Sequence, residues 1–278
     1  MKAVYNLLYP IAMCLSRIKA GHRLRLSNAR PETGKVLVIY AANHTNMYDG
    51  PLFLRAVGRH CRPLYGKQPL YLADRLYLKM LGVIWVDRAS REGRSSVKQA
   101  LIDALRRGYS IQWFPEATWN MTDNLPMLPM RWGIIDVAQQ SGALIVPLAL
   151  DYEGNARTCN VRFGQPIDST GVDRAEGIRQ LRDSHATLRW EQWSERGVHS
   201  RAELDVEGER RRIFHAVEEY PPLEYEVEMK YVFNLFPSAP DLFLVPNGRT
   251  AFLFNKRLRG APKAFPHGEG GICGANDG

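Results

Sequence analysis

Five short apolar runs constrain the fold of this 278-residue chain more than any other feature. They read "KVLVIYAAN" (35–43), "GVIWVDR" (82–88), "SIQWFPE" (110–116), "ALIVPLALDY" (143–152) and "TCNVRFG" (158–164). Their length and β-branched content are typical of buried strands. Helical patterns lie among them: residues 95–108 begin with a serine cap and end at a glycine, and residues 131–142 also end at a glycine. Strands that alternate with helices predict an α/β fold, with a parallel-rich mixed sheet flanked by helices.

The chain beyond Gly164 has a different character. Two charged stretches, 172–196 and 200–219, predict helices, whereas "PPLEYEVEMKYVFNLF" (221–236) is ambiguous between strand and helix. We therefore predict four regions. These are an N-terminal membrane-associating helical segment (1–28), an αβ domain (29–170), a mostly helical C-terminal extension (171–259) and a disordered tail rich in glycine and proline (260–278). The alternative is that the C-terminal helices pack back on the sheet.

The N-terminal segment is apolar from Ala3 to Leu15, with interruptions at Asn6 and Pro10. As a helix it would reach about 20 Å, which is too short for the roughly 30 Å hydrocarbon core of a bilayer. One helical face holds Val4, Leu7, Leu8, Ile11, Leu15 and Ile18, and the basic residues Arg17, Lys19, Arg23 and Arg25 follow. This pattern predicts a helix that lies in the membrane interface. A core helix is one alternative; a signal peptide is another, although no A-x-A site follows.

Positive charge is concentrated in the first 150 residues. They contain 20 Lys and Arg against 9 Asp and Glu, a net charge of +11, whereas residues 151–278 contain 17 against 20, a net charge of −3. The basic half predicts an acidic partner, such as a phosphate-bearing small molecule, an anionic membrane or a nucleic acid. Because no nucleic-acid-binding module is visible, we expect no nucleic acid partner. The four cysteines are widely spaced, so we expect a reducing compartment, no disulfide framework and no metal site.

His44 and Asp49 follow the first apolar run, in "AANHTNMYDG" (41–50). On a straight helix an offset of five residues leaves the two side chains about 140° apart. They can therefore meet only if the chain bends between strand and helix. If they meet, the carboxylate holds one ring nitrogen and the other nitrogen is free to accept a substrate proton, which makes a general base. A purely structural hydrogen bond is the alternative.

No protein nucleophile accompanies this pair. The chain has no G-x-S-x-G elbow, no P-loop and no G-x-G-x-x-G after a predicted strand, so we expect the nucleophile to be a substrate hydroxyl. Arg88 lies at a strand end, and arginine is well shaped to bind phosphate. Glu116 and Thr118 follow another strand, at the edge where ligands gather in parallel sheets. Pro147 lies inside an apolar run, which predicts a bulge or an edge strand.

Four short segments, "NHTNMYD", "VDR", "FPEATW" and "IVPLAL", occur in the order and spacing of a known set of motif blocks. They resemble the blocks of the PlsC-type glycerolipid acyltransferases, the 1-acylglycerol-3-phosphate and related lysophospholipid acyltransferases, over roughly residues 30–170. The resemblance implies an αβ domain with a parallel-rich sheet and an N-terminal membrane-docking helix. It also implies that a glycerol hydroxyl attacks an acyl thioester, from acyl-CoA or acyl carrier protein, with no resident cofactor.

The resemblance implies roles for individual residues. His44 matches the general base and Asp49 its orienting partner. The implied substrate-binding residues are Asn43, Lys67, Arg88, Phe114, Pro115, Glu116, Thr118 and Pro147, of which Lys67 and Arg88 are candidates for the acceptor phosphate. Lys67 and Leu70 match the family's K-x-x-L pair.

The third block departs from the family pattern FPEGTR, because Ala117 replaces the glycine and Trp119 replaces the arginine. Loss of that arginine removes a charge-assisted phosphate contact of about 1.5–3 kcal/mol, for which Arg131 is a candidate substitute. We expect Trp119 to stack on a headgroup or lie at the bilayer interface.

The leading hypothesis is a membrane-associated O-acyltransferase that acts on a lysophosphatidic-acid-like glycerolipid. We expect it to be peripheral or monotopic on the cytoplasmic face of the membrane. A second hypothesis keeps the chemistry but changes the acceptor to a lysolipid without a phosphomonoester, or to another amphipathic alcohol. A third is an inactive membrane-surface homologue, and a fourth is a metal hydrolase that pairs His44 with His22, His60 or Cys61.

Overall fold

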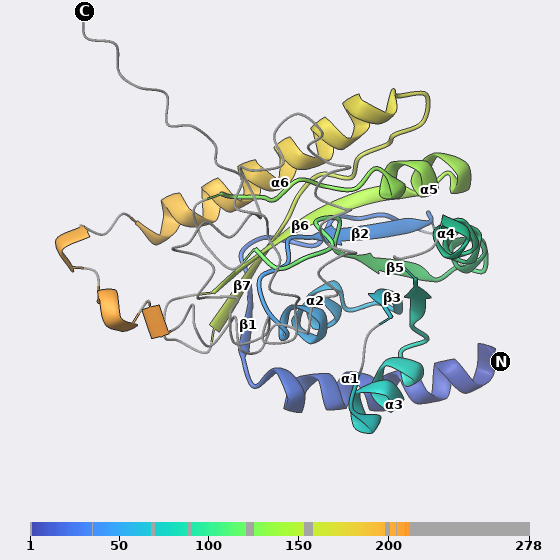
Figure 1. The fold of residues 1–278 in the computed structure, drawn as a ribbon, viewed down its shortest axis with the longest axis horizontal. Helices are drawn as coiled ribbons and strands as arrows, with labels where there is room; N and C mark the ends of the chain where they lie inside the picture. Colours follow the sequence, from blue (N-terminus) through green and yellow to red (C-terminus); the bar gives the residue numbers. More distant parts are fainter. Residues whose placement is uncertain are drawn as a thin grey trace, which may run out of the picture. The chain divides into compact units, whose positions relative to one another are not determined.

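The computed structural model (Figure 1) describes most of the first 211 residues. The described ranges are 2–34, 36–67, 70–87, 91–120, 125–152, 158–197, 201–203, 205–208 and 210–211. The chain divides into two compact units, Met1–Leu223 and Glu224–Gly278, and all described residues belong to the first. Most of the predicted helix at 200–219, the ambiguous segment at 221–236 and the predicted tail therefore lie outside the described residues.

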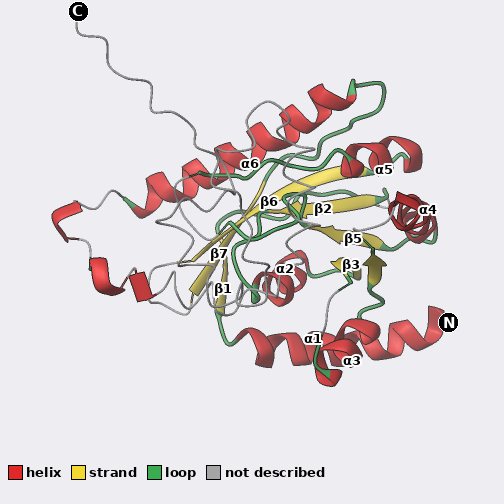
Figure 2. Ribbon diagram, in the orientation of Figure 1, coloured by secondary structure: helices red, strands yellow, loops and turns green. Residues whose placement is uncertain are grey.

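A seven-stranded sheet forms the centre of the first unit (Figure 2). Its strands are β1 (Arg23–Leu26), β2 (Val38–Ala42), β3 (Cys61–Gly66), β4 (Ile84–Val86), β5 (Ser110–Trp113), β6 (Leu144–Tyr152) and β7 (Thr158–Phe163). The spatial order is β1-β7-β6-β2-β5-β3-β4, and the five strands from β6 to β4 are parallel. The strand β7 is antiparallel to β6, and β1 is parallel to β7. The predicted parallel-rich mixed sheet is confirmed, and all five apolar runs contain strands.

Helices cover both faces of the sheet (Figure 1). They are α1 (Lys2–Ala20), α2 (Asp49–Val57), α3 (Leu72–Met80), α4 (Arg91–Arg106), α5 (Gly133–Ser141) and α6 (Arg174–Arg196), and a short 3₁₀ helix follows at Arg201–Glu203. Side chains of α1, α2 and α3 share one hydrophobic core, and those of α4, α5 and α6 share the other. The described part of the first unit thus forms a three-layer arrangement with the sheet in the middle.

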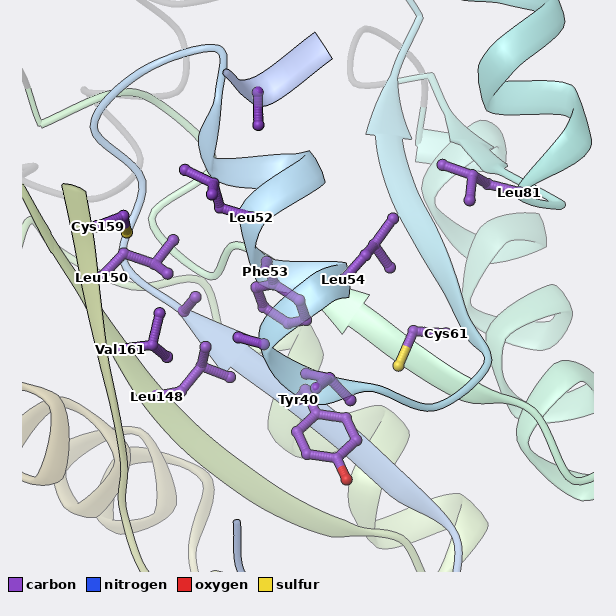
Figure 3. Packing of buried hydrophobic residues seen from close by; sticks show 14 of the residues in the cluster. Tyr40, Leu52, Phe53, Leu54, Cys61, Leu81, Leu148, Leu150, Cys159 and Val161 are labelled. Atoms are coloured by element: carbon purple, nitrogen blue, oxygen red, sulfur yellow. The ribbon is translucent and has the colours of Figure 1, made fainter. Parts of the chain in front are cut away.

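Strand β2 shows why both faces must be covered. All five of its residues are buried: Val38, Tyr40 and Ala42 face one core, and Ile39 and Ala41 face the other. A strand that is buried on both sides reads as a continuous apolar run, as this one does. Figure 3 shows the first core, where side chains of α2 such as Phe53 pack against β2 and β6.

Pro147 does not lie on an edge strand, one of the two placements that the sequence predicted. It lies in β6, which pairs with β2 on one side and β7 on the other. Its carbonyl oxygen accepts a hydrogen bond from Gly164 N at 2.8 Å, so its missing N–H also points toward the β7 side. Since β7 ends at Phe163, the proline lies just beyond the end of that ladder. A Cβ on Gly164 would come within 2.8 Å of Pro147 Cγ, so a glycine fits best here.

Helix α6, the first helix of the predicted C-terminal extension, packs back on the sheet. The Asp173 side chain caps its N-terminus by accepting from Ala175 N and Glu176 N. Further along, the buried Arg189 donates to the Leu150 carbonyl and to the Asp151 carboxylate, both at 2.8 Å. The alternative that a C-terminal helix covers the sheet therefore holds for α6.

Candidate active site

His44 and Asp49 meet in the structure. Strand β2 ends at Ala42, the chain bends through residues 43–48, and α2 begins at Asp49. The bend brings His44 Nδ1 to 2.8 Å from Asp49 Oδ2. The His44 side chain is 20% exposed, whereas Asp49 is fully buried. The sequence predicted that this pair could form only if the chain bends, and the turn between β2 and α2 is that bend.

The Asp49 carboxylate is held by donors from three directions. Its Oδ2 also accepts from the backbone N–H groups of Thr45 at 2.5 Å and Asn46 at 2.9 Å. Its Oδ1 accepts from the Tyr152 hydroxyl at 2.5 Å. Asp49 is also the first residue of α2, where the helix dipole favours an acidic side chain. These contacts leave the carboxylate little freedom and so fix the imidazole that it holds.

Tyr152 is a site residue that sequence reasoning missed. It is the last residue of β6, the strand beside β2, so its hydroxyl reaches the same rim as His44. Burial, and then the nearby Asp49 charge, raise the pKa of Tyr152 well above its ordinary value, so its hydroxyl stays protonated and donates. The only sequence signal was a tyrosine that ends an apolar run.

Glu116 joins two loops and does not face solvent. Its Oε1 accepts from His44 N and its Oε2 from Leu128 N, both at 2.9 Å. Burial raises the pKa of Glu116 to about 8, although the two amide donors partly oppose that rise. A carboxyl group whose two oxygens both accept from backbone amides holds the two loops of the site together. The family resemblance implies that Glu116 belongs to a segment that binds the acceptor. The contacts of Glu116 in the structure are internal and do not bear on that role.

Asn43 has a similar internal position. Its side-chain amide donates to the Leu150 carbonyl at 3.0 Å, and its Oδ1 accepts from Leu150 N at 2.7 Å. It is almost fully buried. Asn43 therefore joins the end of β2 to β6 and fixes the backbone just before His44.

Two aromatic side chains of the third block contact the His44 ring. Phe114 stacks on it, with ring centroids 4.1 Å apart and an interplanar angle of 15°. The Trp119 indole N–H donates to His44 Nε2 at 3.0 Å. Trp119 is only 8% exposed, so the expectation that it lies at the bilayer interface is wrong. The side chain points toward the imidazole.

The backbone conformation at Ala117 explains why the family pattern has a glycine at this position. It adopts a left-handed backbone with φ of 60°, the only described non-glycine residue to do so. Its N–H bonds to the Phe114 carbonyl at 3.0 Å across a turn with Pro115 in second place. Thr118 follows, half-buried. Arg131, the candidate substitute cation, is held beside this turn, because its N–H donates to the Pro115 carbonyl at 2.9 Å.

Lys67, one of the two predicted phosphate ligands, lies farther along the rim. Lys67 follows β3, its side chain is 64% exposed, and its Nζ lies 3.5 Å from Asp87 Oδ2, beyond β4. Strand β3 is the second neighbour of β2, so roughly 10 Å of sheet separates it from the His44 strand. Leu70, its K-x-x-L partner, packs at the edge of the first core. Arg88 lies outside the described residues.

A hollow of about 520 Å³ between β4 and α4 is not part of this site. Its lining includes Arg62 and Arg107, and Arg107 precedes β5, at the opposite end of the sheet from His44. Across the described ranges no group of three His, Cys, Asp or Glu side chains is placed to hold a metal ion. Nothing in the described structure therefore favours the metal-hydrolase hypothesis.

Comparison with known proteins agrees with the motif blocks. A family model described as acyltransferase matches residues 23–151, which include both His44 and Trp119. Residues 23–151, somewhat under half of the chain, are thus similar to the acyltransferase family, and we refer to them as the acyltransferase domain. This segment begins at β1 and ends within β6.

Two curated proteins are similar in sequence to this chain. The chain is 24% identical to a lyso-ornithine lipid O-acyltransferase of Pseudomonas aeruginosa over 181 residues, 53% of this chain and 66% of that one. It is 30% identical to a 1-acyl-sn-glycerol-3-phosphate acyltransferase of Neisseria gonorrhoeae over 102 residues, 36% and 39% of the two chains. The matches thus span about two thirds and two fifths of these curated relatives.

The fold matches a solved structure. The crystal structure of the 1-acyl-sn-glycerophosphate (LPA) acyltransferase PlsC from Thermotoga maritima aligns with a TM-score of 0.57 and 16% identity. The alignment covers 72% of this chain and 84% of that one. The PlsC-type resemblance of the motif blocks is confirmed.

Proposed function

We propose that this protein is a membrane-associated O-acyltransferase that transfers a fatty acyl group from an acyl thioester to the hydroxyl of a lysophosphatidic-acid-like glycerolipid. The observation that carries the proposal is the 2.8 Å contact between His44 and Asp49 at the carboxyl end of β2, within the acyltransferase domain. A histidine that is oriented by a buried carboxylate is the recurring arrangement of a general base.

The chemistry needs no nucleophile from the protein. His44 Nε2 takes the proton of the acceptor hydroxyl as its oxygen attacks the thioester carbonyl carbon. The tetrahedral intermediate collapses, the C–S bond breaks, and the leaving thiolate takes the proton back from the imidazolium. The donor is a substrate, acyl-CoA or acyl-acyl carrier protein, and no resident cofactor takes part.

The test of the base is His44→Ala. We expect acyl transfer to fall roughly 10²- to 10⁴-fold, while thioester binding stays unchanged, because proton removal and not binding is lost. His60→Ala is the matched control, since that ring stacks on Tyr9, away from the His44 rim. Transfer at the wild-type rate by the His44 variant would refute the assignment.

The acceptor has two candidates, each with its own support. The exposed Lys67 at the rim and the Neisseria relative, whose name specifies a phosphomonoester acceptor, favour a lysophosphatidic-acid-like lipid. The substitution of Trp119 for the family arginine and the lyso-ornithine lipid relative favour a lysolipid without a phosphomonoester. Mass spectrometry of the products from a mixed lysolipid pool and a labelled thioester distinguishes them. Exclusive acylation of the neutral or zwitterionic lysolipids would reject the first candidate.

Helix α1 supports the membrane part of the proposal, because its orientation leaves large apolar residues outside. Leu7, Ile11, Leu15 and Ile18 are 72%, 50%, 41% and 74% exposed. The small residues Ala12, Ser16 and Ala20 are buried instead, and the Ser16 hydroxyl lies 2.6 Å from the Tyr77 hydroxyl of α3. An apolar stripe of this kind fits a lipid surface.

Helix α3 extends this apolar surface. It packs on α1, and its N-cap residue Tyr71 is exposed, as are Leu72 and Leu76 within the helix. Arg17 of α1 and both Arg75 and Lys79 of α3 are exposed as well, which suits an anionic lipid surface. Of the helices in the described part of the chain, none combines the length and apolar character that crossing a bilayer requires. We infer peripheral or monotopic docking, on the cytoplasmic face.

A triple substitution tests this docking surface. Leu7→Glu, Ile11→Glu and Ile18→Glu together should release the protein from vesicles that contain anionic lipid, as measured by flotation. Transfer to an acceptor in detergent micelles should persist, because the change leaves the His44 site intact. Val206→Glu, at a residue that is also exposed, is the control. Unchanged flotation of the triple variant would show that α1 does not dock.

A further inference from the structure

The Trp119 side chain is hydrogen-bonded to His44 Nε2, the nitrogen that the proposed base needs to accept a proton. An indole N–H can only donate, so the 3.0 Å contact makes His44 Nε2 the acceptor. The imidazole proton must then lie on Nδ1, from which it is donated to Asp49 Oδ2 at 2.8 Å. The two neighbours thus independently specify the same tautomer, the one in which Nε2 acts as a base.

This contact and proton abstraction exclude each other. A neutral imidazole has one lone pair on Nε2, directed in the ring plane, and a substrate hydroxyl would have to donate to the same lone pair. With Phe114 stacked on one face of the ring and Asp49 holding Nδ1, the imidazole has no second orientation in which to meet the hydroxyl. The indole must therefore move before the base can act.

The loop that carries Trp119 is held against the backbone of His44. Asn120, the next residue, donates its N–H to the His44 carbonyl oxygen at 2.6 Å. Glu116, three residues before Trp119, accepts from His44 N at 2.9 Å. The backbone of His44 is thus bound on both sides by the loop that carries the indole. A side chain that is 8% exposed and held in this way is a built part of the site.

We propose that Trp119 is a displaceable cap on the general base, and that it selects the lipid hydroxyl over water as the nucleophile. The inference rests on the proposed acyltransferase function. Without the cap, a water molecule can donate to Nε2 and its oxygen can attack the thioester carbonyl. The C–S bond then breaks, the thiolate takes the proton from the imidazolium, and a free fatty acid forms.

The selectivity for the lipid hydroxyl over water follows from the binding energy that each nucleophile can gain in the site. An acceptor lipid gains binding energy from its acyl chain and headgroup, and part of that energy can displace the indole hydrogen bond. A water molecule has no remote group that could supply such binding energy. The loss of the hydrogen bond between Trp119 and His44 is therefore not offset when water displaces the indole. The cap therefore suppresses hydrolysis more strongly than transfer.

Trp119→Phe in the full-length protein tests the cap, because it keeps an aromatic ring and removes the N–H. The assay measures free CoA released from palmitoyl-CoA, with and without 1-oleoyl-lysophosphatidic acid in detergent micelles. We expect hydrolysis in the absence of acceptor to rise roughly three- to tenfold, the effect of one lost hydrogen bond. The KM for the acceptor should fall while kcat for transfer stays within about twofold.

Trp190→Phe is the matched control, since that indole is 66% exposed on α6. Unchanged hydrolysis in Trp119→Phe, in a preparation that unfolds at the wild-type temperature, would overturn the cap. If the variant does not fold, hydrogen exchange of the Trp119 indole N–H in the wild-type protein decides. The exchange should be slow alone and at least tenfold faster with the lysolipid, and equal rates would overturn the inference.

The two proposals fail in different ways. Wild-type transfer by His44→Ala would reject the base and with it the cap. An inactive His44→Ala together with wild-type hydrolysis by Trp119→Phe would reject the cap alone.

Discussion

Two loops meet at His44, and they differ in how closely they follow the pattern of their family. The loop of residues 43–49 keeps the histidine and the acid of the first block, and the buried Asp49 has a donor for each of its two oxygens. The loop of residues 114–120 departs from the pattern at two positions, and both departures have visible consequences. Ala117 has a strained backbone, and the Trp119 indole covers His44 Nε2, the nitrogen of the proposed base.

The difference between the loops separates the two tasks of the site. In the proposed mechanism, proton transfer depends on one fixed geometry, so the 43–49 loop has little room for substitution. The choice of nucleophile would depend on what reaches His44 Nε2, and the 114–120 loop would control that approach. We therefore expect substitutions in the first loop to reduce catalysis outright, and substitutions in the second to change selectivity or stability.

Asp49→Asn should give the largest effect. The amide group would place N–H donors against the donors that now surround the carboxylate, and the imidazole would lose its orienting charge. We expect transfer to fall roughly 10²- to 10⁴-fold in a steady-state assay. Asp183→Asn, an exposed aspartate on α6, should have wild-type activity. Retention of activity by Asp49→Asn would erase the contrast between the loops.

Glu116 predicts a stability that depends on pH, because its pKa is raised from 4.5 to about 8 in the folded protein. Between these values the unfolded chain has lost its proton while the folded one keeps it, so stability falls as pH rises from about 5 to 8. The slope should be at most about 1.4 kcal/mol per pH unit.

Urea unfolding of wild type and Glu116→Gln at several pH values measures this slope. The glutamine has no proton to lose, so the difference in free energy of unfolding between the two proteins should shift in favour of the variant as pH rises. A constant difference from pH 5 to 8 would show that Glu116 is already charged at pH 5 in the fold.

Tyr152→Phe should have an intermediate effect. It removes the hydroxyl that donates to Asp49 Oδ1, while the two backbone donors of the first loop remain. A lost hydrogen bond to a charged group predicts about a tenfold fall in kcat, with little change in the KM for the donor. Tyr48→Phe is the control, because no hydrogen bond joins its hydroxyl to Asp49 in the described contacts. Equal kinetics for the two variants would remove Tyr152 from the site.

Ala117→Gly should have the smallest effect and the opposite sign. Glycine adopts positive φ without the steric cost that alanine has, so we expect the free energy of unfolding to rise by about 0.5–1 kcal/mol. The same replacement at Ala186, inside α6, should lower it by about 1 kcal/mol. Thermal unfolding of both variants measures the contrast. Destabilisation by Ala117→Gly would show that the loop tolerates this backbone without strain.

Sequence reasoning found the strands that lie in apolar runs and missed β1 and β3. The apolar runs at 35–43 and 143–152 contain β2 and β6, because strands that are buried on both faces leave a clear signal. Strand β1 reads "RLRL" and β3 includes a proline and a glycine, so neither shows a β-branched apolar run. Helices α2 and α3 were missed as well, although α5, which is also nine residues long, was predicted.

The sequence by itself determined the kind of sheet, the strand end at which the polar residues gather, and the two departures in the third block. Tertiary structure alone decided that His44 meets Asp49, that Tyr152 reaches the same carboxylate, and that the Trp119 indole covers Nε2. The reason is that periodicity and turn propensity act over a few residues. The contacts among positions 44, 119 and 152 depend instead on the order of β6, β2 and β5 in the sheet, which no local pattern encodes.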